Sequence, residues 1–221
     1  MVVLGLTGGI ACGKSAVSDR LRQCGAQIVD ADAIARQLVA PGTPGLHAVV
    51  QHFGSEFLDS QGMLLRAKLG QRVFGNPAEL KVLEGLLHPM IRQEIARQLA
   101  AAAQAGRPLA VVDAALLLEM ALDASCDATV TVEADPEQQI ARVAARDGMP
   151  RDQALQRLAA QASSADRRAR ATWTIDNRGT LADLDLAVQQ LVQALAERFV
   201  ALRPWARAVA AGGFSHSPGT P

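Results

Sequence analysis

Residues 8–15 read Gly8-Gly9-Ile10-Ala11-Cys12-Gly13-Lys14-Ser15, which fits the pattern G-x-x-x-x-G-K-[ST] of a phosphate-binding loop. Gly13 lets the backbone approach the phosphates, and successive backbone N–H groups point inward to hold them. We expect Lys14 to reach the β- and γ-phosphates and the Ser15 hydroxyl to bind Mg²⁺. A helix that starts at about Lys14 would direct the positive end of its dipole at the anion. The stretch therefore predicts a site for a nucleoside triphosphate.

The residues on either side of the motif make it more specific. Residues 2–7 form a short apolar run typical of a buried strand, and the residues after Ser15 have helical apolar spacing at Ala16, Val17, Leu21 and Cys24. Strand, glycine loop and helix are the context that the motif requires. The alternative is a tight glycine turn that opens an ordinary βα unit.

The composition restricts the class of protein. The chain has 221 residues and a formal net charge of zero, so it lacks the basic character of a protein that binds nucleic acid. No window is long and apolar enough for a membrane span, and no signal peptide is visible. The three cysteines match no metal or redox spacing, which favours a reducing compartment. We expect a cytoplasmic protein with no nucleic-acid or membrane partner.

Five short apolar runs alternate with helical patterns, which predicts an α/β fold with a five-stranded, largely parallel sheet. The expected strands are Val2–Leu6, Gln27–Val29, Leu109–Val112, Ala128–Val132 and Thr172–Ile175. Two intervening stretches are too long for simple crossovers. We expect a nucleotide-binding core of residues 1–39, 107–135 and 171–203, a helical insertion over 40–106, an arginine-rich lid over 136–170, and a disordered tail over 204–221.

Two carboxylates follow the second expected strand, in the sequence Asp30-Ala31-Asp32. Ligands of open α/β sheets bind beyond the carboxyl ends of the strands. One carboxylate would assist the metal or anchor the loop, and the other would accept a proton from a substrate hydroxyl. The alternative is that Asp30 or Asp32 caps the helix that follows.

Arginines are concentrated in the expected lid. Arg142 and Arg146 are four residues apart and share one helix face directly after the fourth strand. A lid that carries arginines suits phosphoryl transfer, because the charge on the transferred group must be neutralised. The alternative is a solvated helix face.

Further motifs occur in a fixed order along the chain. They are Gly5-Leu6-Thr7-Gly8-Gly9-Ile10, Asp30-Ala31-Asp32 with Ile34-Ala35-Arg36, His88-Pro89-Met90-Ile91, Leu116-Leu117-Leu118-Glu119, Arg146-Asp147, Ala160-Gln161 and Ile175-Asp176-Asn177-Arg178-Gly179. In this order, over residues 1 to about 200, the chain resembles the dephospho-coenzyme A kinases, relatives of the nucleoside monophosphate kinases.

The resemblance implies a phosphate-binding-loop NTPase fold with a helical substrate domain and a mobile lid. It implies transfer of the γ-phosphoryl group of ATP, with Mg²⁺, to the ribose 3′-hydroxyl of dephospho-coenzyme A, the last step of coenzyme A synthesis. It also implies a monomer or a weak homo-oligomer. The implied catalytic residues are Asp32 as the base, Lys14, Arg142 and Arg146. The implied nucleotide-binding residues are Gly8, Gly9, Ile10, Ala11, Cys12, Gly13, Lys14, Ser15, Ala16, Asn177 and Gly179, with Ser15 on the metal. The implied substrate-binding residues are Thr7, Asp32, His88, Leu117 and Glu119.

The chain departs from the family pattern in a few places. Ala11-Cys12 stands where Gly-Ser is usual, Ala16 replaces a common threonine, and Ala115 replaces a usual proline. Cys12 lies next to Lys14 and near a helix N-terminus, which predicts a thiol of lowered pKa whose alkylation blocks activity and is prevented by ATP. The alternative for Cys12 is an inert small side chain.

Several roles stay open at this level. His88 would either contact the substrate or simply cap or pack. Asp113 ends an apolar strand as a metal-binding aspartate of such enzymes would, but an ordinary turn residue is favoured there. Another small-molecule kinase and a nucleotide-dependent switch are the rival functions, because acceptor specificity would reside in residues 40–106.

Overall fold

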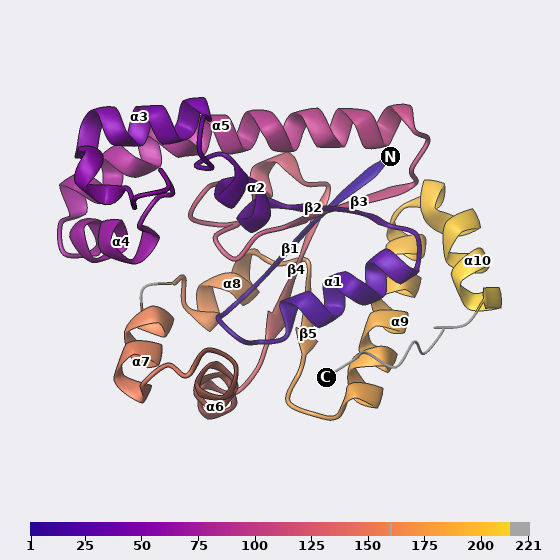
Figure 1. The fold of residues 1–221 in the computed structure, drawn as a ribbon. Coiled ribbons are helices and arrows are strands. Elements are labelled where there is room, and N and C mark those ends of the chain that lie inside the picture. The colour runs from indigo at the N-terminus through magenta and orange to yellow at the C-terminus, as the bar shows by residue number, and fades with distance from the viewer. Residues whose placement is uncertain (160, 213–221) are drawn as a thin grey trace. The chain divides into compact units, whose positions relative to one another are not determined.

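The computed structural model describes residues 1–159 and 161–212 (Figure 1). The chain divides into two compact units, one of residues 1–29 with the chain from 101 onward, and one of residues 30–100. The second unit therefore begins ten residues before the expected insertion of 40–106 and ends six residues before its expected end.

The first unit is built on a five-stranded sheet in the order β2-β3-β1-β4-β5. The strands are β1 (Val2–Gly8), β2 (Gln27–Asp30), β3 (Leu109–Asp113), β4 (Ala128–Glu133) and β5 (Trp173–Asp176). β1 pairs in parallel with β3 and β4, and β4 pairs in parallel with β5. The predicted α/β class and all five predicted strands are confirmed, with ends that shift by one or two residues. Apolar runs form the central strands because helices cover both faces of a parallel sheet.

Helices of the first unit connect and follow these strands. They are α1 (Lys14–Gln23), α6 (Pro136–Asp147), α7 (Arg151–Ala159), α8 (Ser164–Arg170), α9 (Leu181–Arg198) and α10 (Arg203–Gly212), with short 3₁₀ helices at Asp123–Ser125 and Val200–Leu202. Leu4 and Leu6 of β1 pack with Val17 and Leu21 of α1, and Leu195 of α9 joins the same core. Of the apolar positions that predicted α1, Val17 and Leu21 are fully buried, and Ala16 and Cys24 are partly buried against the same core.

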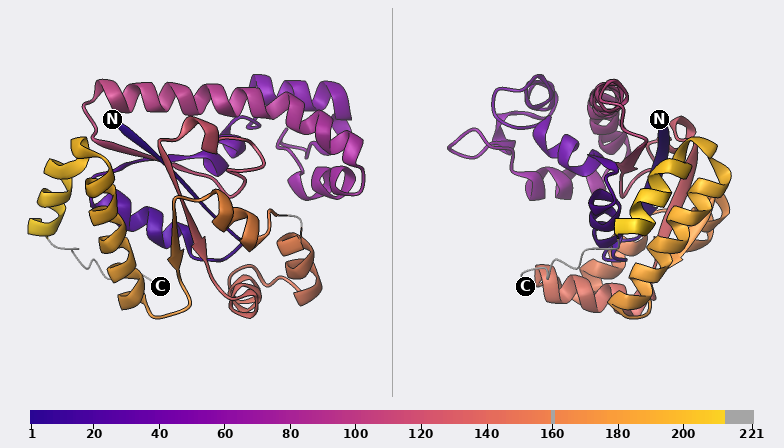
Figure 2. Two further views of the ribbon diagram at one scale, coloured as in Figure 1. Left: turned by 180° about the vertical axis from the view of Figure 1, so that it is seen from behind. Right: turned by 90° about the vertical axis from the view of Figure 1, so that its right-hand side faces the viewer.

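The C-terminal helices correct the expectation of a disordered tail from residue 204. α9 begins with a capping box in which Thr180 and Asp183 exchange side-chain and backbone hydrogen bonds. It packs against α1 and α10, as both views in Figure 2 agree. Trp205 of α10 is buried in the core, and its indole N–H donates to the Cys24 carbonyl at 2.6 Å. Residues 204–212 are therefore folded, and residues 213–221 lie outside the described part of the chain.

The second unit is helical, as its apolar spacing predicts. It contains α2 (Ala31–Gln37), α3 (Pro44–Phe53), a 3₁₀ helix (Ser55–Phe57), α4 (Arg66–Phe74) and most of α5 (Pro77–Gln104), which continues into the first unit. One cluster of buried side chains in this unit contains Val39, Leu46, Val49, Phe57, Leu69 and Val73, and Leu80, Leu83 and Leu87 of α5 pack against it. This unit has a small apolar core of its own.

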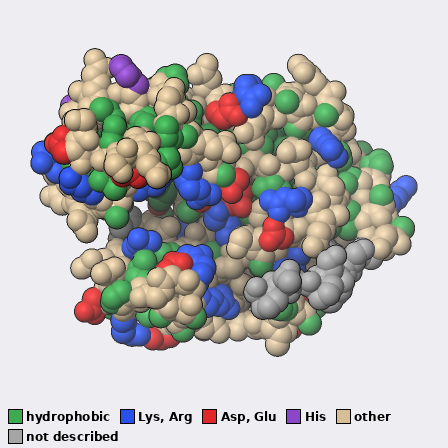
Figure 3. Space-filling view, viewed as in Figure 1, with side chains coloured by type: hydrophobic (Ala, Val, Ile, Leu, Met, Phe, Trp, Pro, Cys, Tyr) green, Lys and Arg blue, Asp and Glu red, His purple; other side chains and the backbone are tan. Residues whose placement is uncertain are grey.

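No helix among the described residues has the length and apolar character needed to cross a bilayer. On the face shown in Figure 3, Lys and Arg side chains lie beside Asp and Glu side chains at several places. This mixture of charges agrees with the zero net charge of the sequence.

Candidate active site

The phosphate-binding loop joins the end of β1 at Gly8 to the start of α1 at Lys14, as predicted. Gly13 has φ of 94° and sits at the N-cap of α1. A side chain at Gly13 would be strained by this left-handed backbone and would collide with the Asn177 amide. Glycine at this position therefore allows both the left-handed backbone of the turn and the close approach of the segment that contains Asn177.

Ala11 also has a left-handed backbone, with φ of 53°. An L-residue other than glycine is strained in this region by contact between its Cβ and the backbone. This conformation gives a physical reason for the glycine that is usual at this position, and for the strain that Ala11 adds to the loop.

Cys12 does not have the lowered pKa that the sequence predicts. Its side chain is only 1% exposed, and burial raises the pKa of the thiol to about 11, although the backbone N–H of Lys14 and the positive charges of Lys14 and Arg167 oppose this. The prediction of a reactive thiol was wrong because desolvation of the thiolate outweighs the nearby positive charge. Cys12 is a small buried side chain of the loop.

Lys14 forms an ion pair with Asp113. Asp113 is the last residue of β3, is 6% exposed, and lies next to β1 in the sheet. The pair therefore links the phosphate-binding loop to the end of the neighbouring strand. Asp113 is therefore a buried, ion-paired residue and not the ordinary turn residue that the sequence favours.

Arg142 and Asn177 connect the loop to the segments that follow β4 and β5. The side-chain amide of Asn177 donates to the Cys12 carbonyl at 2.8 Å. The Arg142 guanidinium donates to the Asn177 carbonyl at 3.1 Å and to the Ala11 carbonyl at 3.4 Å. Two of the predicted site residues thus contact the phosphate-binding loop directly.

A pocket of about 450 Å³ lies beside this connection. It is lined by Gly13, Ala16, Arg142, Asn177, Gly179, Thr180, Leu181 and Leu184. Five of these residues were predicted to bind nucleotide or to act in catalysis. Leu181, which is 71% exposed at the start of α9, was not predicted.

Arg146 has different contacts from Arg142. Its guanidinium forms two hydrogen bonds of 2.8 Å with the adjacent Asp147, and its side chain is 63% exposed. The structure does not bring Arg146 to the loop. Of the two predicted arginines, Arg142 contacts the loop and Arg146 is exposed.

The residues predicted to contact substrate in the first unit have three different environments. Thr7 is buried, and its hydroxyl lies 3.5 Å from the Ala115 carbonyl. Leu117 is fully buried, and a Cβ on Gly5 would lie 2.9 Å from its side chain, so this side chain packs in the interior. Glu119 is exposed and accepts a hydrogen bond from the Ala162 backbone N–H at 2.9 Å.

Asp30, Asp32 and His88 belong to the second unit. Asp30 caps α2 by accepting a hydrogen bond from Ala33 N at 2.7 Å, which confirms the capping alternative for this residue. Asp32 lies in the first turn of α2 and is half-buried. His88 lies in α5, where burial lowers the pKa of the imidazole, with Arg92 adding to the effect and Glu84 opposing it.

Two further contacts escaped prediction from the sequence. The Ile10 backbone N–H donates to the Gln161 side chain at 2.8 Å, and Arg167 forms a buried pair with Glu133. The only signal of the first was the Ala160-Gln161 motif, and Arg167 was one arginine among several in the lid.

A phosphate-binding loop after the first strand of a parallel sheet, with an arginine of α6 bonded to the loop, is the arrangement of a kinase of the phosphate-binding-loop class. The structure resembles TT1252 from Thermus thermophilus, with a TM-score of 0.76, 32% identity, and coverage of 88% of this chain and 97% of that one. A shikimate kinase from Acinetobacter baumannii, at 15% identity and a TM-score of 0.53, has the same fold over 90% of this chain and 96% of its own.

The family model described as dephospho-CoA kinase matches residues 2–183. A dephospho-CoA kinase of Frankia casuarinae is 46% identical over 90% of this chain and 85% of its own length. One of Thermobifida fusca is 42% identical over 90% of this chain and 98% of its own length. The chain belongs to the dephospho-CoA kinase family and is a transferase that phosphorylates dephospho-CoA.

Proposed function

We propose that this kinase transfers the γ-phosphoryl group of ATP to the ribose 3′-hydroxyl of dephospho-CoA, which is the last step of coenzyme A synthesis. The observation that carries the donor side is the loop itself: Lys14 at the start of α1, bonded to Asp113, with Arg142 and Asn177 on the loop carbonyls. This arrangement supplies backbone N–H groups and fixed positive charge where the phosphates need them.

In this proposal, Lys14 and Arg142 stabilise the negative charge that is shared between the β- and γ-phosphates as the bond to the leaving oxygen breaks. The pocket lined by Asn177, Gly179 and Leu181 receives the adenine and ribose, because it is adjacent to Gly13 and Ala16 of the loop. Its volume suits a ligand of nucleoside size. Arg146 joins the γ-phosphoryl group only when the lid closes, since it pairs with Asp147 in this structure.

The residues present also fit Mg²⁺. Ser15 is exposed in the first turn of α1, and Asp113 offers a carboxylate oxygen at the end of the adjacent strand. Among the described residues no group of three or more His, Cys, Asp or Glu side chains could hold a metal. Mg²⁺ binds through one or two protein oxygens together with phosphates and water, which suits the Ser15 hydroxyl and the Asp113 carboxylate. When bound, the ion would neutralise charge on the phosphate oxygens.

We assign the role of general base to Asp32. The residue follows the end of β2 by two positions, and ligands of open parallel sheets bind beyond the carboxyl ends of the strands. Its carboxylate would accept the proton of the 3′-hydroxyl as the oxygen attacks phosphorus. The residues of the second unit, including His88, would bind the acceptor, and closure of the lid would exclude water, which otherwise competes as an acceptor.

The remaining assignments rest on the composition and, for the oligomeric state, on the family resemblance. We propose a cytoplasmic protein that acts as a monomer or a weak homo-oligomer without nucleic-acid or membrane partners, which the mixed surface charge supports.

The proposed reaction is tested by coupled ADP release with ATP and a panel of acceptors. Dephospho-CoA, adenosine and nucleoside monophosphates are compared at equal concentration, and the position of the new phosphate is read by ³¹P NMR. Turnover with dephospho-CoA at least a hundredfold above the others is expected. Equal turnover with a nucleoside monophosphate, or a product phosphorylated at another hydroxyl, would contradict the proposal.

A further inference from the structure

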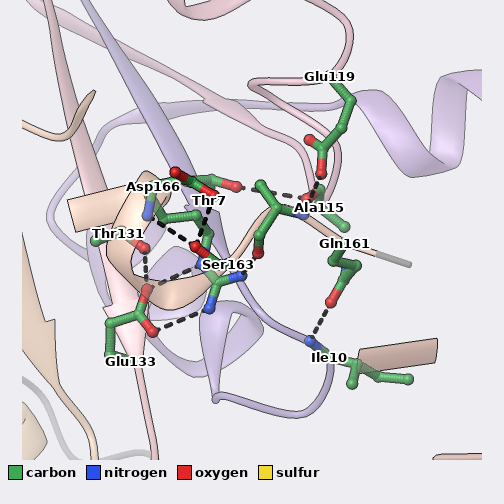
Figure 4. A network of polar contacts seen from close by, with 11 residues as sticks. Thr7, Ile10, Ala115, Glu119, Thr131, Glu133, Gln161, Ser163 and Asp166 are labelled. Atoms are coloured by element: carbon green, nitrogen blue, oxygen red, sulfur yellow. Dashed lines mark hydrogen bonds and ion pairs between the residues drawn. The ribbon is translucent and has the colours of Figure 1, made fainter. Parts of the chain in front are cut away.

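The segment between α7 and α8 forms hydrogen bonds with the rest of its unit through a side chain and through its backbone. The Gln161 side-chain carbonyl accepts the Ile10 N–H at 2.8 Å, and the Glu119 carboxylate accepts the Ala162 N–H at 2.9 Å (Figure 4). Consecutive residues of this segment therefore bind two elements that are far apart in the sequence.

A buried ion pair supports the same segment from the other side. Arg167 of α8 donates to the Ala162 carbonyl at 2.5 Å and forms two hydrogen bonds of 2.9 Å with Glu133 at the end of β4. The Thr131 hydroxyl adds a hydrogen bond to Glu133 at 2.7 Å. The Arg167 and Glu133 side chains are 8% and 3% exposed, so this is a two-point, desolvated contact that holds one geometry.

The phosphate-binding loop lies directly against this support. A Cβ built on Gly9 would be 2.5 Å from the Gln139 Nε2 atom and 3.1 Å from Arg167 Nη2. Gly9 thus allows the backbone to rest on the guanidinium group, and its neighbour Ile10 donates its N–H to Gln161. Two adjacent residues of the loop are therefore held by residues of α6, of α8 and of the segment between α7 and α8.

We propose that Gln161 is a positioning residue that holds the phosphate-binding loop in its nucleotide-ready form. Its carbonyl oxygen fixes the Ile10 N–H and thereby orients the first half of the loop, whose later N–H groups face the phosphates. The role of those N–H groups rests on the proposed function. The benefit is preorganisation, because a loop that is already ordered loses less conformational freedom when ATP binds.

Two observations distinguish this role from simple packing. Gln161 is half-buried and uncharged, so its truncation leaves no buried charge without a partner. The buried support of Arg167, Glu133 and Thr131 does not include its side chain. Loss of the Gln161 carbonyl is therefore expected to free the loop while the rest of the unit stays folded.

The test replaces the carbonyl while keeping the length of the side chain. In Gln161→Met the acceptor for Ile10 N–H is lost, and Gln161→Asn, one methylene shorter, serves as a second variant if the first does not fold. Gln156→Met is the matched control, since Gln156 is an exposed glutamine of α7 for which no side-chain hydrogen bond is found among the described residues. The Kd for ATP is measured by calorimetry, and KM for dephospho-CoA by ADP release.

We expect both Gln161 variants to bind ATP about tenfold more weakly, with the melting temperature little changed and KM for dephospho-CoA within about twofold of wild type. The Gln156 variant should match wild type. A purely structural effect would lower the fraction of active protein and leave the Kd of that fraction unchanged, which would overturn the proposal. So would a Kd within twofold of wild type in both variants.

The calorimetric result is independent of the acceptor. Wild-type protein that binds ATP but does not turn over dephospho-CoA would contradict the proposed function alone, and the Kd of the Gln161 variants would still decide the positioning role.

Discussion

The phosphate-binding loop and the helical unit of residues 30–100 hold their polar side chains in different ways. Around the loop, hydrogen bonds join residues far apart in the sequence, such as Asn177 with Cys12 and Gln161 with Ile10. In the helical unit, the side-chain hydrogen bonds mostly join near neighbours, such as Arg72 with Glu79 and Arg97 with Glu94, around a small apolar core.

This difference bears on how each part contributes to the reaction. Dipoles and cations that are already held in place must stabilise the charge on a transferred phosphoryl group. A network of long-range hydrogen bonds holds such groups in place. An acceptor is selected by the shape of its pocket and by a few polar groups. A helical unit with an apolar core can supply both without a long-range network of hydrogen bonds. Replacing single polar residues in each part tests this contrast.

The largest expected effect is on the acceptor side. Asp32→Asn should lower kcat about 10²–10⁴-fold while ATP binding stays near wild type, because an amide cannot accept the hydroxyl proton. Initial rates of ADP release and calorimetry with ATP measure the two quantities. Asp59→Asn is the control, since the carbonyl oxygen of asparagine can keep the hydrogen bonds from Gln61 and Met63 N–H. A folded Asp32→Asn variant with wild-type turnover would remove Asp32 as the base and leave the helical unit without a catalytic group.

The next effect is on the donor side. Lys14→Met should lower kcat about 10²–10³-fold, the usual cost of one lost electrostatic contact to a transition state, and should also weaken ATP binding. The same two assays apply. Lys81→Met, an exposed lysine of α5 in the helical unit, should keep wild-type values. Equal losses in both variants would show that the phosphate-binding loop has no special part in the reaction.

A stability effect is expected at the buried pair beneath the loop. Glu133→Gln should lower the free energy of unfolding by about 3 kcal/mol, because the Arg167 charge stays buried without its partner. Urea denaturation followed by circular dichroism measures this value. If the free energy of unfolding falls by less than about 0.5 kcal/mol, water or another group must solvate the Arg167 guanidinium in the variant. The buried pair would then be less rigid than its geometry indicates.

The same pair gives a pH dependence with a defined sign. Burial raises the pKa of Glu133, but hydrogen bonds from Arg167, Thr131 and Ser164 outweigh it and hold the pKa below the ordinary value of 4.5. A lowered folded pKa means that the carboxylate stabilises the fold fully above 4.5, and that this contribution disappears as pH falls through the folded value. When the pH falls from 5 into the acid range, the free energy of unfolding of Glu133→Gln should therefore decrease less than that of the wild type.

The smallest effect is expected within the loop. Ala11→Gly should raise the free energy of unfolding by about 1 kcal/mol, because glycine removes the strain at φ of 53°. Thermal denaturation with and without ATP measures it, and Ala16→Gly in the helical first turn of α1 should instead be destabilising. A destabilised Ala11→Gly variant would show that the entropy of the unfolded chain outweighs the strain.

Local sequence patterns were sufficient for the strands, for α1 and for the phosphate-binding loop, because a strand, a glycine turn and a helix start are determined by residues within a few positions. The same is true of the Asp30 cap. They failed for Cys12, whose reactivity was judged from its neighbours in sequence while its burial in the fold sets the pKa. They also failed for the tail, where Trp205 finds its hydrogen-bond partner at Cys24.

The sequence by itself determined that this protein binds a nucleoside triphosphate on an α/β fold, because the motif, its strand and its helix are contiguous. Only the tertiary structure decided that Asp113 pairs with Lys14, that Arg142 and not Arg146 contacts the loop, and that Gln161 holds Ile10. Each of these contacts joins segments that are about a hundred or more residues apart in the chain, and their meeting depends on the order of strands in the sheet. Strand order is set by the packing of the whole unit, which no local pattern contains.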